Sequence, residues 1–136
     1  MKQLLLLLMF VSQPVWAEWT EISTLAEGTK KEKSLYVDLD SIRKTENGRR
    51  MWHLRDFKVS QRDSKSEPEY KSSKILTEFD CAGERLRTLS ISDHSRSMGT
   101  GDVVWTSNNA GAWKYSSPGS VGEALLGYAC NNPVKR

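Results

Sequence analysis

The sequence has little that would support catalysis or metal binding. It contains two cysteines, Cys81 and Cys130, and two histidines, His53 and His94. The cysteines are far apart in the chain, so their spacing excludes a C-x-x-C redox centre and a zinc site built on close ligand pairs. Phosphate-binding glycine loops and nucleophile-elbow patterns are also missing. These absences predict a protein that is not an enzyme, with no catalytic residues, no cofactor and no metal site.

A strong net charge and a membrane-spanning apolar run are missing too. The formal net charge is only +3, from 20 Lys+Arg against 17 Asp+Glu, which is too weak to predict a nucleic-acid partner. Residues 4–11 form the longest apolar run, well short of the ~20 residues that a spanning helix needs. Hydrophobic residues make up 38% and charged residues 27% of the chain, as in ordinary globular proteins.

The apolar run lies where a secretory signal would lie. Lys2 precedes it, and Val15-Trp16-Ala17 approximates a small-residue cleavage pattern. We therefore predict a signal peptide over 1–17, cleaved after Ala17, and an exported single domain over 18–136. A retained membrane anchor is the alternative. No cysteine lies near the cleavage point, so we expect no lipid attachment at a new N-terminal cysteine.

Export places both cysteines in a compartment that permits disulfides. Two cysteines allow only one intramolecular pairing, so we predict a Cys81–Cys130 disulfide. Cys81 ends an extended run at 75–81, and Cys130 lies in the last helix-like segment. Closing a loop of this size stabilises a fold by roughly 4 kcal/mol at most. The bond would tie a C-terminal helix to a sheet.

Most of the remaining chain reads as extended segments. Alternating or β-branched residues predict strands near 19–22, 34–38, 50–59, 70–81, 84–92 and 103–106. Asn47-Gly48 predicts a hairpin with a type I′ turn. Acidic and serine residues at 38–42 predict a tight turn. In the 50–59 strand, the apolar residues switch from one set of alternate positions to the other, which predicts a bulge near Arg55-Asp56. The polar stretch 60–69 predicts a mobile loop.

One helix is predicted at the C-terminal end. Ser120 and Glu123 form a capping box that opens a helix over about 121–130. Gly122 and Gly127 weaken it by up to about 1 kcal/mol each, so packing and the disulfide must hold it in place. The predicted fold class is α+β: a curved antiparallel sheet of about six strands with one C-terminal helix packed on it, tied by the disulfide.

Several short motifs together resemble the bacterial surface-adhesin protein E family. They are Tyr36-Val37-Asp38, Trp52-x-Leu54, Glu78-Phe79-Asp80-Cys81 with Arg85 and Arg87 soon after, Pro118-Gly119-Ser120 and the closing Cys130. The resemblance covers nearly the whole chain after residue 17. It implies a curved antiparallel sheet with a helix anchored by a disulfide, in the periplasm or at the cell surface of a Gram-negative bacterium. The family includes an adhesin that binds host extracellular-matrix and serum proteins.

Two functional hypotheses follow. The first is a non-enzymatic protein-binding module whose partner is a host matrix or serum protein, or another envelope protein. It would use the sheet surface or the 60–69 loop. The candidate binding residues are Arg49, Arg50, Lys71, Lys74, Arg85 and Arg87.

The alternative is a small periplasmic ligand-binding protein or enzyme with a site between helix and sheet. Four aromatic residues are candidates to line it: Trp105, Trp113, Tyr115 and Tyr128. Core packing is the simpler explanation of these aromatics, and a filled helix–sheet interface would count against such a site. Oligomeric state is not predicted.

Overall fold

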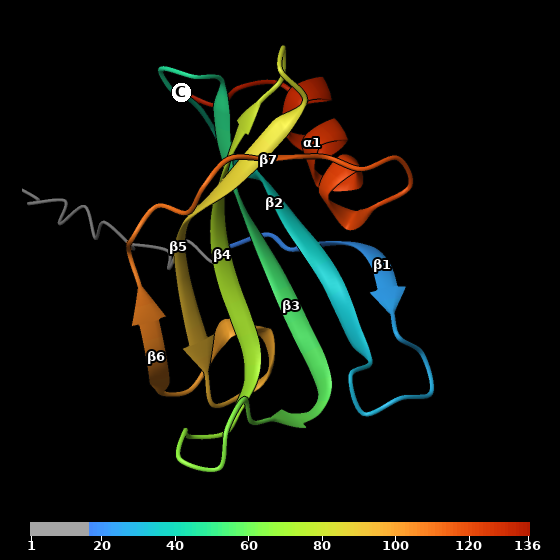
Figure 1. Ribbon diagram of the computed structural model, residues 1–136, viewed down its shortest axis with the longest axis vertical. Helices are drawn as coiled ribbons and strands as arrows, with labels where there is room; N and C mark the ends of the chain where they lie inside the picture. The colour runs from blue at the N-terminus through green and yellow to red at the C-terminus, as the bar shows by residue number, and fades with distance from the viewer. Residues whose placement is uncertain (1–16) are drawn as a thin grey trace, which may run out of the picture.

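The computed structural model describes residues 17–136, and it contains one antiparallel sheet and one α-helix (Figure 1). The predicted signal peptide lies outside the described residues except for Ala17, so its cleavage stays a prediction. No helix within 17–136 is long and apolar enough to cross a membrane. The elements are β1 (Thr20–Leu25), β2 (Lys33–Lys44), β3 (Arg49–Gln61), β4 (Tyr70–Asp80), β5 (Arg85–His94), the 3₁₀ turn η1 (Ser97–Gly99), β6 (Val103–Ser107), β7 (Lys114–Tyr115) and α1 (Val121–Asn131).

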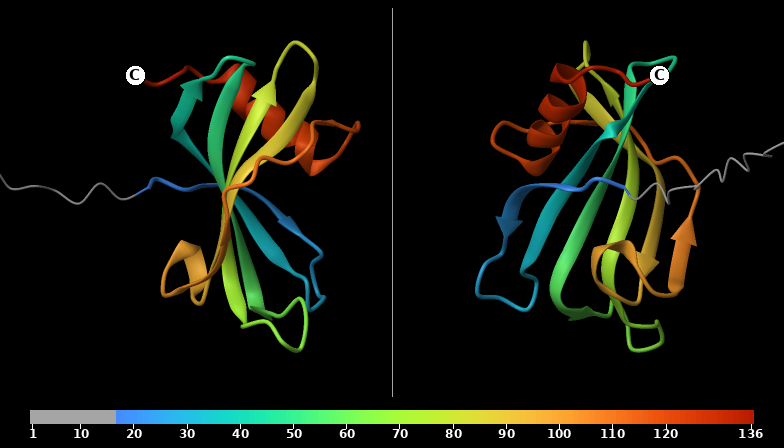
Figure 2. Two further views of the ribbon diagram at one scale, coloured as in Figure 1. Left: turned by 60° about the vertical axis from the view of Figure 1, so that its left-hand side comes forward. Right: turned by 180° about the vertical axis from the view of Figure 1, so that it is seen from behind.

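The strands follow one another in the sheet in the order in which they occur in the chain. The order is β1-β2-β3-β4-β5-β6, all neighbours are antiparallel, and β7 pairs with the far end of β5. Within residues 17–136, β1 and β6 therefore form the two edges of the sheet (Figure 1). The left view of Figure 2 shows the strands spreading from a narrow waist, as in a strongly twisted sheet. The predicted fold class is confirmed.

The helix covers one half of one face, which we call the helix face. Leu125 and Ala129 are buried against Val37, Met51 and Phe79 of the sheet. Ser120 caps the helix as predicted, since its Oγ accepts a bond from the Glu123 amide at 3.2 Å. The reciprocal half of the capping box is replaced, because the Ser120 amide donates to the Ser117 carbonyl.

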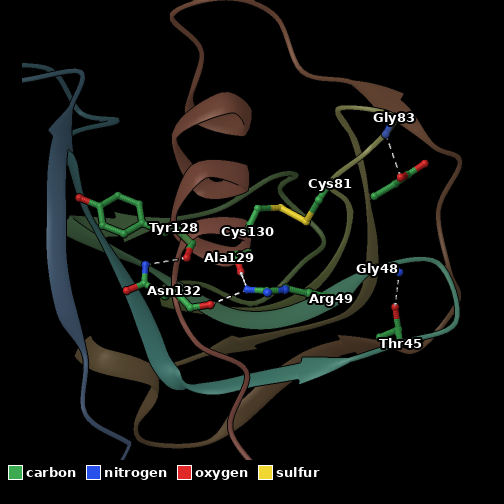
Figure 3. The surroundings of a disulfide bond; sticks show 10 residues. Thr45, Gly48, Arg49, Cys81, Gly83, Tyr128, Ala129, Cys130 and Asn132 are labelled. Carbon is green, nitrogen blue, oxygen red and sulfur yellow. Dashed lines mark hydrogen bonds between the residues drawn. A yellow bond between two sulfur atoms is a disulfide. The ribbon is translucent and has the colours of Figure 1, made fainter.

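The predicted disulfide is confirmed. Cys81, just after β4, is bonded to Cys130 in the last turn of α1, with the Cα atoms 5.9 Å apart (Figure 3). The bond joins positions 49 residues apart in sequence. The C-terminal turn of the helix is therefore fixed to the sheet at the end of a central strand.

The tight turn predicted at 38–42 is wrong, because β2 continues through it. The β2–β3 register shifts between Asp38 and Arg43, which marks a bulge. Ser41 Oγ donates to the Asp38 carbonyl at 2.6 Å and accepts from the Trp52 amide at 2.9 Å. The polar side chains do form hydrogen bonds with nearby backbone groups, but these groups are the ones that the bulge leaves without a partner in the sheet.

The Asn47-Gly48 hairpin is present, but the predicted turn type is wrong. Neither residue is among those with a positive φ angle, which a type I′ turn requires. Instead, the Thr45 amide donates to the Gly48 carbonyl at 2.9 Å, closing a longer loop. Glycine is needed at position 48 because a Cβ there would overlap the Phe79 carbonyl of β4.

The bulge predicted near Arg55-Asp56 is wrong. The β3–β4 register is regular through Asp56 and becomes irregular only before Gln61. The apolar residues switch between alternate positions because both faces of β3 are covered. Phe57 is buried on the helix face, and Leu54 is buried on the opposite face, which we call the outer face.

The 3₁₀ turn η1 covers part of the outer face. The Met98 amide donates to Asp56 Oδ1 at 2.9 Å, and the Gly99 amide donates to Ser72 Oγ at 2.8 Å. Leu54 lies below with no exposed surface. The right view of Figure 2 shows η1 and the first described residues crossing this side of the sheet. η1 does not extend over the half of the outer face near the 45–48 hairpin.

Candidate functional site

A row of charged side chains crosses this remaining half of the outer face. The register places Arg43 opposite Arg50, Arg50 opposite Glu78, and Glu78 opposite Arg87 across β2, β3, β4 and β5. Directly opposite residues project from the same face of a sheet. Asp80 and Arg85 form the adjacent pair on β4 and β5. We call the four arginines the arginine row: Arg43, Arg50, Arg85 and Arg87.

Two members of the arginine row are held by carboxylates. Arg87 forms an ion pair with Glu78 at 2.8 Å, and Glu78 is only 4% exposed. Arg85 forms an ion pair with Asp80, also at 2.8 Å. The pKa of Asp80 is lowered below its ordinary value. The largest cause is the hydrogen bond from Arg85, and the second is the hydrogen bond from the Gly83 amide. Both guanidinium groups therefore have fixed orientations.

Trp113 adds an aromatic surface to the same place. Its ring centroid lies 4.6 Å from the guanidinium carbon of Arg85 and 4.6 Å from that of Arg87. These distances fit cation–π interactions, which are strongest on tryptophan. Trp113 was a candidate for a pocket between helix and sheet, and it lies on the outer face instead.

Arg43 and Arg50 form no ion pair with a carboxylate within residues 17–136. Arg43 Nη1 donates to the carbonyls of Asp40 at 2.7 Å and Ile42 at 3.0 Å, which are neutral acceptors. Arg50 is exposed and forms no ion pair within residues 17–136. Glu78, its cross-strand neighbour, is already bonded to Arg87. A ligand carboxylate that reaches this end of the row meets guanidinium groups with free donors.

The remaining predicted binding residues lie elsewhere. Arg49 points to the helix face, where its Nη1 donates to the carbonyls of Ala129, at 2.9 Å, and Asn132 (Figure 3). Lys74 lies on the outer face beside η1, with its side-chain carbons against Gly99. Lys71 is half-buried near the start of β4. The structure thus brings together Arg50, Arg85 and Arg87 and separates them from the other three.

Two members of the candidate site were missed in the sequence. Arg43 has no readable signal, because a two-residue turn at Asn47-Gly48 would place Thr45 opposite Arg50, whereas the longer loop shifts the register and places Arg43 there. Trp113 has none either, since it follows β6 through an irregular connection before β7.

The four aromatic residues that were candidates to line a site between helix and sheet do not come together at that interface. Leu125, Phe79 and Met51 fill it and are at most 4% exposed. Tyr115 is 79% exposed, while Trp105 lies on β6 at the sheet edge. No group of three or more His, Cys, Asp or Glu side chains in the described chain is placed to hold a metal ion.

Comparisons with known proteins agree with this fold. The profile of the surface-adhesin protein E family matches residues 19–131. A crystal form II structure of Haemophilus influenzae protein E is 14% identical, with a TM-score of 0.58, and the alignment covers 71% of this chain and 80% of that chain. The selenomethionine form is 12% identical, with a TM-score of 0.59, covering 82% and 86%. No curated protein sequence matches significantly. The family match spans most of the chain, which therefore belongs to the surface-adhesin protein E family.

Proposed function

We propose that this chain is an exported, non-enzymatic protein-binding module of the cell envelope, and that the arginine row is a surface through which it binds. Membership of a surface-adhesin family supports an adhesin-like role. The observation that carries the proposal is the arginine row itself, with more guanidinium groups than carboxylates gathered on one open part of the sheet.

The chemistry of the row fits an acidic segment of a protein partner. Guanidinium groups bind carboxylates through paired, directional hydrogen bonds. Arg85 and Arg87 are already oriented by Asp80, Glu78 and Trp113, so little side-chain entropy is lost when a partner binds. Tryptophan and arginine are also the residues that most often dominate binding energy at interfaces. The partner is a host matrix or serum protein, or another envelope protein.

The test uses the 18–136 protein with its disulfide intact, immobilised against purified extracellular-matrix and serum proteins and against an envelope extract. Arg50→Glu reverses an unpaired charge without breaking an ion pair within the molecule. We expect it to weaken capture at least tenfold, about 1.4 kcal/mol. Lys31→Glu is the matched control, since it makes the same charge change at an exposed loop position, and we expect it to leave capture unchanged.

Arg50→Glu is a cleaner probe than changes at Arg85 or Arg87. Removing Arg87 would leave the buried Glu78 carboxylate unpaired and destabilise the fold. If no protein in either panel is captured, the binding-module proposal is wrong. Capture that is insensitive to Arg50→Glu would retain the module and reject the arginine row.

A further inference from the structure

The edge strand β6 lacks the usual protection against pairing with another chain. It has the sequence Val-Val-Trp-Thr-Ser, without a charged residue or proline, whereas edge strands are commonly protected by such residues. Val103 is 57% exposed and Trp105 is 49% exposed. The opposite edge strand, β1, carries Glu21. β6 is therefore the edge better suited to accept a new strand.

No strand within the described residues pairs with β6 on the side that faces away from β5. β6 is last in the strand order, and within 17–136 its ladder bonds run only to β5 (Figure 1). Pairing with β5 is regular at Trp105, Thr106 and Ser107, and Val104 is an extra residue before them. A strand's alternate N–H and C=O groups point away from its one neighbour. These groups are available to an incoming backbone.

A hollow of about 470 Å³ lies beside this edge on the helix face, below the helix. Its walls include the rings of Phe57, Tyr70 and Trp105. Three carboxyl groups line it, those of Asp63, Glu67 and Asp93, against a single cation. That cation is Arg55. The hollow thus combines aromatic walls with an excess of negative charge.

The carboxyl groups differ in how free they are. Asp93 is 7% exposed and accepts a 2.6 Å bond from Ser73 Oγ, and burial raises its pKa. Arg55 offers it an opposing charge. Asp63 accepts a 3.0 Å bond from the Tyr70 hydroxyl, and Glu67 lies with it on the exposed 62–69 loop. Asp63 and Glu67 form no ion pair in the described part of the chain, so their negative charge lies at the rim of the hollow.

We propose that β6 binds an extended basic peptide segment of a partner protein as an added strand. Backbone bonds to the free edge would supply affinity, and alternate side chains would point to opposite faces. Lysine or arginine side chains fit the helix-face side, where the stem packs on Trp105 and the charge reaches the rim carboxylates. The other side chains meet Val103, which borders a second hollow of about 760 Å³ on the outer face.

This surface is independent of the arginine row. The row would bind acidic segments on the other face of the sheet, whereas the β6 edge would bind basic ones. A second copy of the chain is a poorer occupant, because pairing two β6 edges would bring two hollows of like charge together.

The test titrates the isotopically labelled 18–136 protein with an acetylated synthetic peptide of alternating lysine and valine. We expect slowed hydrogen exchange at β6 amides and no change at β1 amides, which form the other edge. A peptide with glutamate in place of lysine should bind at least tenfold more weakly, because it opposes the hollow's charge. A peptide with proline at alternate positions should also bind at least tenfold more weakly, because it lacks the backbone donors.

Variants locate the site on the protein. Val103→Lys places a protective charge on the edge and should reduce binding at least tenfold, as should the double change Asp63→Asn and Glu67→Gln. Val59→Lys is the matched control, since Val59 is 47% exposed on an interior strand. Equal binding of the proline peptide, exchange unchanged at β6, or no binding at all would overturn the proposal. Self-association that protects β6 in the free protein would assign the edge to a second copy.

Discussion

At the scale of single residues, adjacent arginines have unlike roles. Arg49 and Arg50 point to opposite faces of β3, and only Arg49 reaches the C-terminal end of α1. Cations stabilise the exposed carbonyls at helix C-termini, and hydrogen bonds from charged donors contribute about 1.5–3 kcal/mol.

We therefore predict that Arg49→Ala lowers the free energy of unfolding by about 2 kcal/mol, while Arg50→Ala changes it by less than about 0.5 kcal/mol. Urea denaturation of both variants, followed by circular dichroism, measures the difference. Equal losses for the two variants would contradict the structural role of Arg49.

A buried histidine predicts a pH dependence of stability. Burial, followed by the nearby charge of Arg55, lowers the pKa of His53 to about 3, and its Nε2 lies 2.9 Å from Thr77 Oγ1. Between this value and the ordinary histidine pKa of about 6.5, the unfolded chain binds the proton and the folded chain does not. Stability therefore falls as pH decreases, by up to about 1.4 kcal/mol per pH unit.

Denaturation at several pH values between about 6.5 and 4.5 tests this slope, above the range where most carboxyl groups titrate. His53→Gln removes the titrating group, and we expect it to give a flatter profile than the parent protein. His94, whose pKa is also lowered by burial and by Lys74, contributes equally to both. Parallel profiles for the two proteins would contradict the prediction.

The sequence identifies residue types better than it identifies the face on which each residue lies. Arg50, Arg85 and Arg87 were predicted to bind a partner and do lie together, but Arg49 was grouped with them although it faces the helix. Exposure and ion pairing depend on neighbours from other strands, as between Glu78 and Arg87. A single sequence does not contain that register.

At the scale of elements, the disulfide holds a weak helix. α1 contains Gly122 and Gly127, each unfavourable in a helix interior by up to about 1 kcal/mol. The Cys81–Cys130 bond fixes its last turn to the end of β4.

We predict that Cys81→Ser with Cys130→Ser lowers the free energy of unfolding by up to roughly 4 kcal/mol. Hydrogen exchange should show earlier loss of protection in α1 than at the centre of β3 and β4. Uniform loss across helix and sheet would mean that the bond stabilises the domain as a whole and not the docking of α1.

The helix cap gives a smaller, local effect. Ser120 Oγ accepts a hydrogen bond from the Glu123 amide, while the Ser117 side chain forms no hydrogen bond in the described part of the chain. Ser120→Ala should cost about 1 kcal/mol, and Ser117→Ala less than about 0.5 kcal/mol, measured by thermal unfolding. The same loss in both variants would contradict the assignment of Ser120 as the cap.

Element types were predictable where local chemistry alone decides them. The capped helix, the β2–β3 hairpin and the pairing of Cys81 with Cys130 are all present. The turn at 38–42 failed because a turn and a bulge both leave backbone groups unpaired, and Asp and Ser bond to them in either case. Only tertiary pairing with β3 distinguishes the two.

At the scale of the whole molecule, each of the two faces of the sheet divides into two halves with different coverings. The helix covers one half of the helix face, and the acidic hollow lies in the other half. On the outer face, η1 covers one half and the arginine row lies in the other. The fold class could be predicted from strand pattern and one capped helix, but these surfaces could not, because bulges on β2 and β5 set which side chains share a face.

The most direct measurement of the central claim is a hydrogen-exchange map of the 18–136 protein bound to a partner captured from the panel. We predict increased protection at residues 43, 50, 85–87 and 113, at the arginine row and Trp113, with weaker protection in the same map for the Arg50→Glu protein. Protection confined to α1 or to the 45–48 hairpin, with none at the row, would contradict it.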